Sequence, residues 1–296
     1  MTCFPCGWSI RLQVIAIVAF MGCAPLITAA DVRPKIKVEK GITYSKIDGK
    51  ELKLDIASPE GKGPFPAVVC IHGGAWRIGS RQDLDVTIED LAEHGFVAAT
   101  VSYRLLPDGK FPDSVVDCRT AVRFLRTNSE KYHINKERFG ALGFSAGGYQ
   151  AAMLGVVTKD PSFDGKEYPD QSSKVQAVVD YFGPSDLALY GKDDLAQNST
   201  FVPLLGARFH DNPEVYAKAS PITYVSKEAA AFLFLHGTKD WIVPIEHSRE
   251  MCKKLQEAGV TAKIVEVAGA SHGWKGAKSK ETWAASFKFL EEQLKK

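Results

Sequence analysis

The sequence predicts an α/β fold in which a mostly parallel central sheet carries helices on both faces. Short continuous apolar runs, such as AVVCI at residues 67–71, are typical of strands that are buried on both faces of a sheet. These runs alternate along the chain with stretches of helical apolar spacing, such as Leu84, Ile88 and Leu91. Such alternation indicates parallel strands joined by helices that cross from one strand to the next.

The expected elements follow one another from residue 42 onward. The first two strands form a hairpin, because Asp48-Gly49 between two alternating apolar and polar stretches favours the positive φ of a tight turn. The preceding stretch, residues 31–40, is expected to be a polar lead-in to the first strand. About eight strands are predicted, at residues 42–47, 52–58, 67–71, 96–102, 138–142, 175–182, 231–235 and 263–267. Helices are predicted at residues 81–94, from residue 112 onward, and at 147–157, 213–219, 244–258 and 279–294.

The longest stretch without a clear period is residues 183–212. It contains Pro184, Gly191, Pro203 and Gly206 and begins just after a predicted strand. We therefore expect an irregular lid or rim over a site at that end of the sheet. No repeat or Pro/Gly/Ser-rich linker interrupts residues 31–296, which are expected to form a single domain.

Composition excludes several classes of function. With 45% hydrophobic and 24% charged residues the chain falls in the ordinary globular range, and its net charge of +2 leaves no basic surface for nucleic acid. Beyond residue 30 there are three cysteines, Cys70, Cys118 and Cys252, which are expected to be buried thiols. No histidine or cysteine spacing predicts a metal site. Four histidines are expected to face solvent or cap helices: His94, His133, His210 and His247.

The first thirty residues resemble a secretory signal. Arg11 precedes an apolar stretch, residues 12–24, and Thr28-Ala29-Ala30 supplies small residues for cleavage. We expect cleavage near Ala30, a secreted or periplasmic location, and no stable membrane insertion of the mature chain. A retained membrane anchor, or a lipid anchor at Cys23, is the alternative, although the residues before that cysteine fit a lipid-attachment signal poorly.

The candidate nucleophile is Ser145, in the sequence Gly143-Phe144-Ser145-Ala146-Gly147. It falls between a predicted strand and a small-residue helix, where glycines two residues to either side allow a sharp turn. The pattern is weak by itself, since a serine here could simply cap the helix. Motifs elsewhere in the chain change this judgement: HGGAW at residues 72–76, HGTKD at 236–240 and SHGW at 271–274.

Two further residues complete a candidate catalytic set. A serine hydroxyl needs a base to accept its proton, and the base needs a carboxylate to hold its tautomer. Asp240 and His272 each follow a predicted strand, so both are expected at the carboxyl edge of the sheet, where open α/β sheets place their sites. Asp186 follows the preceding strand and is the alternative acid.

The remaining candidates surround the reacting carbonyl. The backbone N–H groups of Gly73, Gly74 and Ala146 are expected to form an oxyanion hole, because the glycines carry no side chain and Ala146 directly follows the serine. Trp76 could be a core residue or a wall of the substrate site. Phe144, beside the serine, is also expected to contact substrate.

In these residues the chain resembles the α/β-hydrolase superfamily, in particular the carboxylesterases near hormone-sensitive lipase and the small bacterial acetyl-xylan and feruloyl esterases. The resemblance extends over residues 42–294 and includes the family's chain order of serine, acid and histidine. It also includes Ser102-Tyr103-Arg104-Leu105 after a strand. Ala75 replaces a third glycine of the lipase relatives, and the hairpin replaces their helical N-terminal cap, which disfavours lipid-like substrates.

The resemblance implies an exported serine esterase that forms an acyl-enzyme on Ser145 without metal or organic cofactor. Its expected substrates are small-molecule or polysaccharide-linked esters with short acyl groups, either acetyl or small aryl acyl. The HGGAW form also resembles kynurenine formamidase, so an aryl formamidase or another amide-hydrolysing α/β hydrolase is the alternative. A non-catalytic binding protein with this fold is a third reading. The sequence makes no prediction of the oligomeric state.

Overall fold

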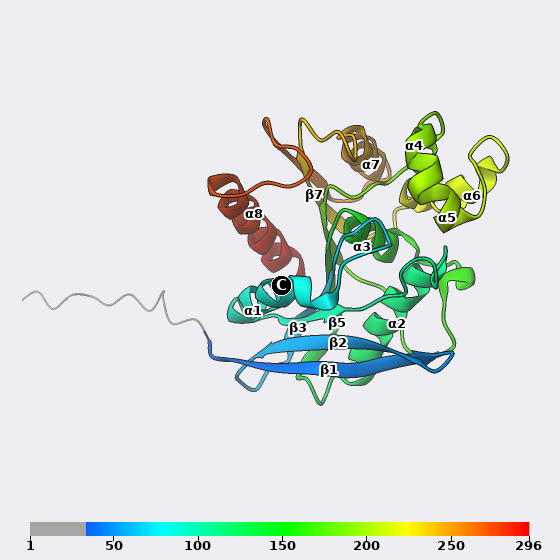
Figure 1. Cartoon of the computed structure of the whole chain (residues 1–296). Helices are drawn as coiled ribbons and strands as arrows, with labels where there is room; N and C mark the ends of the chain where they lie inside the picture. Colours follow the sequence, from blue (N-terminus) through cyan, green and yellow to red (C-terminus); the bar gives the residue numbers. More distant parts are fainter. Residues whose placement is uncertain (1–33, 296) are drawn as a thin grey trace, which may run out of the picture. The chain divides into compact units, whose positions relative to one another are not determined.

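The computed structural model describes residues 34–295, in which eight strands form one sheet (Figure 1). The strands are β1 (Ile36–Ile47), β2 (Lys50–Pro59), β3 (Phe65–Ile71), β4 (Val97–Val101), β5 (Ile134–Phe144), β6 (Ala177–Tyr181), β7 (Ala231–Gly237) and β8 (Ala262–Val267). Their order across the sheet is β1-β2-β4-β3-β5-β6-β7-β8. Only β1 with β2 and β2 with β4 pair antiparallel within this sheet, and all other neighbours are parallel. The predicted α/β class and mostly parallel sheet are confirmed.

The predicted hairpin is confirmed, but its first strand starts earlier than expected. The turn lies at Asp48 and Gly49, which both have positive φ (49° and 78°). Strand β1 begins at Ile36, and residues 36–39 pair with residues 56–59 of β2, so most of the predicted polar lead-in already belongs to the first strand. The reason is that β1 is an edge strand, where polar side chains can face solvent and the sequence needs no strong apolar alternation.

Two helical layers cover the sheet, as predicted (Figure 1). Helices α1 (Asp85–Glu93) and α8 (Ala277–Leu294) pack with one apolar cluster, and α2 (Asp113–Thr127), α3 (Ala146–Val156) and α7 (Glu246–Glu257) pack with the other. Within β3, Val68 and Cys70 belong to the first cluster and Val69 and Ile71 to the second. This follows from the alternation of side chains along a strand.

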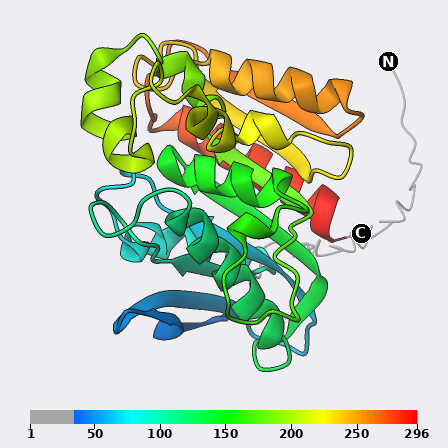
Figure 2. The ribbon, with the colours of Figure 1, turned by 90° about the vertical axis from the view of Figure 1, so that its right-hand side faces the viewer.

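The segment predicted to be irregular, residues 183–212, is largely helical, and that part of the prediction is wrong. It contains the short 3-10 helix η3 (Leu187–Tyr190) and a continuous helical run made of α4 (Asp194–Ala196), η4 (Gln197–Phe201) and α5 (Val202–Leu205). The Asp193 carboxylate starts this run by accepting the Ala196 N–H at 2.9 Å, and Gly206, with φ 83°, ends it. Helix α6 (Pro213–Lys218) follows, and these short helices are yellow-green in Figure 2. The run from Asp194 to Leu205 shows no single helical period in the sequence because η4 is a π-helix, which interrupts the 3.6-residue repeat.

Three further short helices complete the described chain: η1 (Arg81–Leu84), which forms the start of the predicted helix at 81–94, η2 (Pro161–Phe163) and η5 (Pro221–Tyr224). Cys70, Cys118 and Cys252 are buried free thiols, as expected. No helix in residues 34–295 has the length and apolar character that crossing a membrane requires. The predicted signal sequence and Cys23 lie outside the described residues.

The expectation that His247 faces solvent or caps a helix is wrong. Its side chain is fully buried on α7, and its ring stacks 5.1 Å from that of Tyr190. Its Nδ1 accepts the backbone N–H groups of Ser185 and Asp186, both at 3.3 Å. Burial lowers the pKa of His247 to about 3, with a further lowering from the charge of His236, so the imidazole is neutral at ordinary pH.

Candidate active site

Ser145 lies on the turn that joins strand β5 to helix α3. Its backbone has φ 54° and ψ −120°, a combination that a non-glycine residue adopts only when its surroundings hold it there. The Ser145 N–H donates to the Tyr181 carbonyl at 2.8 Å. A Cβ on Gly143 would strike the Gly147 carbonyl, and one on Gly147 would strike the Ile71 carbonyl. The two glycines therefore let three backbone segments pack around the serine.

The three predicted catalytic residues form a hydrogen-bonded chain. The Asp240 carboxylate can only accept, so His272 donates its Nδ1–H to Asp240 Oδ2 at 2.7 Å. The opposite ring nitrogen, Nε2, lies 2.8 Å from Ser145 Oγ and is left free to accept the hydroxyl proton. Asp186 is not part of this chain, because its carboxylate accepts the Ala188 N–H and caps η3.

Several groups besides His272 hold the Asp240 carboxylate in place. Its Oδ1 accepts the backbone N–H groups of Ile242 at 2.9 Å and Val243 at 3.0 Å. His236 places Nε2 3.4 Å from Oδ2, while the same nitrogen donates to the Val243 carbonyl at 2.8 Å. Burial by itself would raise the pKa of Asp240, but the hydrogen bonds from His236, His272 and Val243 outweigh it and hold the pKa well below its usual range. The carboxylate is therefore ionised whenever the enzyme is folded at ordinary pH.

A second buried carboxyl group lies beneath the serine's helix. Asp180, on β6, is fully buried and accepts the Gly183 N–H at 2.8 Å, while its other oxygen has no partner among residues 34–295. A Cβ on Gly148, in the first turn of α3, would strike its carboxyl group. Burial raises the pKa of Asp180 to about 6 against the lowering effects of the Gly183 N–H and His236.

The loop after β3 brings Gly73 against the serine turn, while the neighbouring Gly74 packs against the backbone of Ile78. A Cβ on Gly73 would lie 2.8 Å from the Phe144 carbonyl oxygen and 3.3 Å from Ser145 Cβ. Within residues 34–295, no protein group accepts the backbone N–H of Gly73, Gly74 or Ala146. Ala146 is the first residue of α3, where helix N–H groups have no partner within the helix. The N–H groups of Gly73 and Ala146, next to the serine, and that of Gly74, one residue further along the loop, are therefore without a protein acceptor and available to an oxyanion.

His72 supports this loop from below. Its buried ring stacks 4.5 Å from that of Tyr103, and its Nδ1–H donates to the Gly73 carbonyl at 2.8 Å. Tyr103 in turn donates its hydroxyl to the His72 carbonyl at 3.0 Å. Burial lowers the pKa of His72, which keeps the ring neutral. His72 therefore orients the glycines without contacting the serine.

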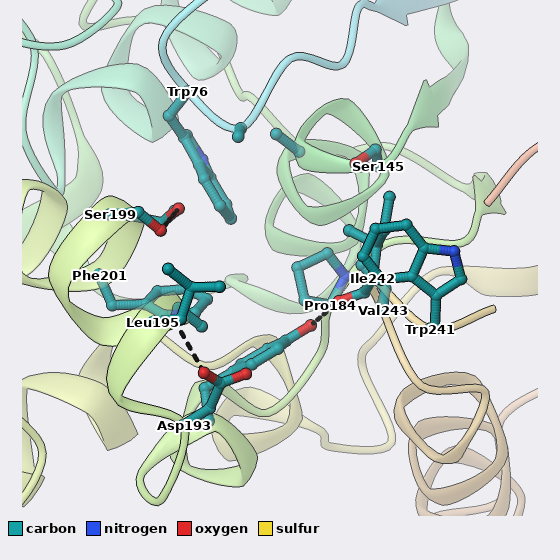
Figure 3. A pocket seen from close by; sticks show the side chains of 15 residues that line it. Trp76, Ser145, Pro184, Asp193, Leu195, Ser199, Phe201, Trp241, Ile242 and Val243 are labelled. Carbon is teal, nitrogen blue, oxygen red and sulfur yellow. Dashed lines mark hydrogen bonds between the residues drawn. The ribbon is translucent and has the colours of Figure 1, made fainter.

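A cavity of about 450 Å³ opens beside Ser145 (Figure 3). Its walls are mostly apolar and aromatic, with a few polar groups: Ala75, Trp76, Ala146, Pro184, Tyr190, Asp193, Leu195, Ala196, Ser199, Thr200, Phe201, Trp241, Ile242 and Val243. Trp76 is both a core residue and a wall, since only 3% of it is exposed and its ring meets Tyr149 at 5.0 Å. Among residues 34–295 no cluster of His, Cys, Asp and Glu side chains could hold a metal ion.

The structure does not support Phe144 as a substrate contact. Phe144 is not part of the cavity wall, and its ring packs 4.6 Å from that of Tyr181 and 6.3 Å from that of Trp283. The physical reason is the strained turn, which turns Ser145 toward the cavity while its neighbour remains in the β5 strand against α8. Tyr190 and Phe201 lie in the segment predicted to be a rim, although the sequence analysis did not single them out as substrate contacts. Trp241 was missed, and its signal was that it directly follows the predicted acid.

Residues 54–255 match the BD-FAE family. The chain belongs to the BD-FAE family. Esterase LipC of Mycobacterium tuberculosis (strain ATCC 25618 / H37Rv) is 30% identical over 77% of this chain. The chain spans 58% of the length of LipC and 55% of that of esterase LipQ from the same organism.

Solved structures of similar proteins superpose on most of this chain. A truncated carbohydrate esterase from gut microbiota superposes with a TM-score of 0.77 at 27% identity, covering 90% of this chain and 99% of that one. Esterase 2 of Thermogutta terrifontis, bound to butyrate, has a TM-score of 0.73 at 26% identity and covers 88% of this chain and 94% of that one. With the strand order described above, these neighbours identify the α/β-hydrolase fold, as the sequence predicted.

Proposed function

We propose that this BD-FAE family protein is a serine esterase that hydrolyses short-acyl carboxylic esters through an acyl-enzyme on Ser145. The observation that carries the proposal is the hydrogen-bonded chain from Ser145 through His272 to Asp240, with distances of 2.8 and 2.7 Å. The relatives named above are esterases, which favours the same reaction class here.

The arrangement suits acyl transfer in two halves. His272 Nε2 accepts the proton as Ser145 Oγ bonds to the carbonyl carbon, and Asp240 stabilises the imidazolium. The N–H groups beside the turn stabilise the oxyanion, each by on the order of 3 kcal/mol. His272 then protonates the departing alkoxide, leaving the acyl group on Oγ. Water attacks this ester in the second half, giving its proton to Nε2, and the carboxylic acid leaves as Oγ regains a proton.

The cavity favours a short acyl group. Its volume of about 450 Å³ must hold parts of both halves of the ester, and the rings of Trp76 and Phe201 close one side of it 6.2 Å apart. A chain that extends beyond the cavity leaves its outer methylenes in water and forgoes about 0.8 kcal/mol of burial free energy for each of them. The butyrate in the T. terrifontis esterase and the carbohydrate esterase among the neighbours favour an acetyl or small aryl acyl group on a polysaccharide or another polar alcohol.

Ser145→Ala tests the nucleophile. The variant is expected to fold and to lose ester hydrolysis by several orders of magnitude, because only oxyanion stabilisation and binding remain. A fluorophosphonate should label wild-type protein once, at the peptide that contains Ser145. Labelling elsewhere, or near-full activity of the variant, would reject the assignment.

A chain-length series of p-nitrophenyl esters, together with acetylated xylan and N-formylkynurenine, tests the substrate. We expect the highest kcat/KM at two to four carbons, on the order of the butyrate seen in the relative. A peak at ten carbons or more would reject the short-acyl proposal. A preference for the formamide would replace the esterase by an aryl formamidase.

We extend the proposal to the location of the protein. A signal sequence cleaved near Ala30 would release residues 31–296 as a single catalytic domain, secreted or periplasmic. The flanking pattern of residues 11–30 supports this. Mass spectrometry of protein recovered outside the cytoplasm is expected to begin at Asp31, and recovery of intact residues 1–30 would reject cleavage.

A further inference from the structure

Exposed apolar side chains gather at the mouth of the cavity. Within residues 34–295, large hydrophobic residues are exposed at six positions, and three of these line the cavity that contains Ser145. They are Leu195, Trp241 and Ile242, with exposed fractions of 79%, 80% and 45%. Exposed apolar groups concentrated at one site, rather than scattered singly, mark a surface that contacts a ligand.

The indole of Trp241 stands on a fixed loop. Asp240 precedes it and anchors the next two residues by accepting the N–H groups of Ile242 and Val243. The carbonyl of Ile242 also accepts the Tyr190 hydroxyl at 3.2 Å. The backbone on both sides of Trp241 is therefore held by the same carboxylate that orients His272, which fixes the base of the indole relative to the reacting atoms.

The opposite wall of the cavity presents polar groups. Ser199 and Thr200 line it from η4, and their hydroxyl oxygens lie 3.3 Å apart (Figure 3). Asp193 lines it as well, with Oδ1 occupied by the Ala196 N–H. A ligand between the two walls meets a flat apolar surface on one side and hydroxyl groups on the other.

Resting on the proposed esterase function, which gives a polysaccharide as one candidate alcohol, we propose that Trp241 determines this specificity by stacking on the sugar ring of the alcohol half. A pyranose offers a face of C–H groups to an indole and hydroxyl groups at its edge, which match the two walls. The acyl half takes the enclosed side, where Trp76 and Phe201 are only 3% and 4% exposed. The larger half extends past an indole that is already open to solvent.

The test compares substrates that differ in the alcohol. Relative kcat/KM is measured for an acetylated xylo-oligosaccharide, 1-naphthyl acetate and ethyl acetate, which carries no ring. In Trp241→Ala the ratio of the sugar ester to ethyl acetate should fall about tenfold, mainly through KM, and Trp241→Phe should restore most of it. The matched control is Val86→Ala on α1, an exposed apolar residue outside the cavity wall, which should leave the ratio unchanged.

Other results would overturn the proposal or the esterase function on which it rests. An unchanged sugar ratio in Trp241→Ala overturns the proposal. A loss confined to 1-naphthyl acetate also overturns it, since the indole then serves aryl alcohols. If wild-type protein hydrolyses none of the three esters, the esterase function itself is rejected, and the sugar subsite with it.

Discussion

Replacing Asp240 by Asn is expected to reduce kcat for ester hydrolysis by about 10³–10⁴-fold without unfolding the protein. The carboxylate accepts two backbone N–H groups at Oδ1 and faces His272 Nδ1 and His236 Nε2 at Oδ2. An amide has only one accepting oxygen. If that oxygen keeps the backbone bonds, the NH₂ group faces Nδ1, and His272 must move its proton to Nε2. The ring then points a donor at Ser145 and cannot accept the hydroxyl proton. A 10⁴-fold loss corresponds to about 5.5 kcal/mol of transition-state stabilisation.

The matched control is Asp186→Asn, at the alternative acid. The Asp186 carboxylate accepts only the Ala188 N–H among residues 34–295, so its variant should stay within about tenfold of wild type in kcat. Both variants are assayed with p-nitrophenyl acetate under saturating conditions, and circular dichroism checks the fold. A rate for Asp240→Asn within tenfold of wild type would refute this reasoning, and a large loss only in Asp186→Asn would move the acid to that residue.

Three further substitutions probe the buried groups around the site. His247 is neutral when folded and gains a proton on unfolding below its ordinary pKa, so wild-type stability should fall from about pH 6.5 toward pH 3 by up to about 1.4 kcal/mol per unit. In His247→Gln, urea denaturation should show a shallower acid slope, and an identical slope would contradict burial as the cause. Asp180 has a pKa raised from 3.8 to about 6 by burial, so stability is lost as the pH rises from about 4 to about 6, and the full loss remains above pH 6. The free energy of unfolding of Asp180→Asn, taken relative to that of wild type, should rise by about 3 kcal/mol between pH 4 and pH 7. A difference that does not change with pH would contradict the raised pKa. Gly147→Ala places a Cβ 2.6 Å from the His72 carbonyl oxygen, so it should destabilise the protein by about 3 kcal/mol or more and abolish turnover. The control is Gly269→Ala, whose Cβ meets open space and which should cost only about 1–2 kcal/mol.

The sheet could be predicted because a strand that is buried on both faces is a continuous run of apolar residues. Residues 67–71 and 231–235 are continuous apolar runs, and each is a buried strand between two helical layers. The site followed from the same rule, since residues directly after such runs meet at one edge. The structure accordingly brings Asp240 and His272 to Ser145, although these residues are far apart in the chain.

Features that depend on tertiary contacts could not be predicted in the same way. In the helical run from Asp194 to Leu205, the π-helical residues of η4 interrupt the 3.6-residue period, so no single helical period is visible in the sequence. His247 lies on a helix whose other residues are mostly polar, and only packing against Tyr190 and the backbone of residues 185–186 buries it. The direction of Phe144 depends on the strain at its neighbour, which the sequence indicates only as a glycine-rich pattern.

Residues 187–205 contribute much of the cavity wall but no member of the Ser145, His272 and Asp240 chain. The reacting groups are carried by turns that the sheet and the nucleophile helix hold in place. Mutations in the wall can therefore accumulate without replacing a residue that transfers a proton. Substrate specificity can change during evolution while the catalytic residues stay the same. For protein engineering, this stretch is the natural place for a combinatorial library, because variants there sample new specificities while Ser145, His272 and Asp240 are unchanged.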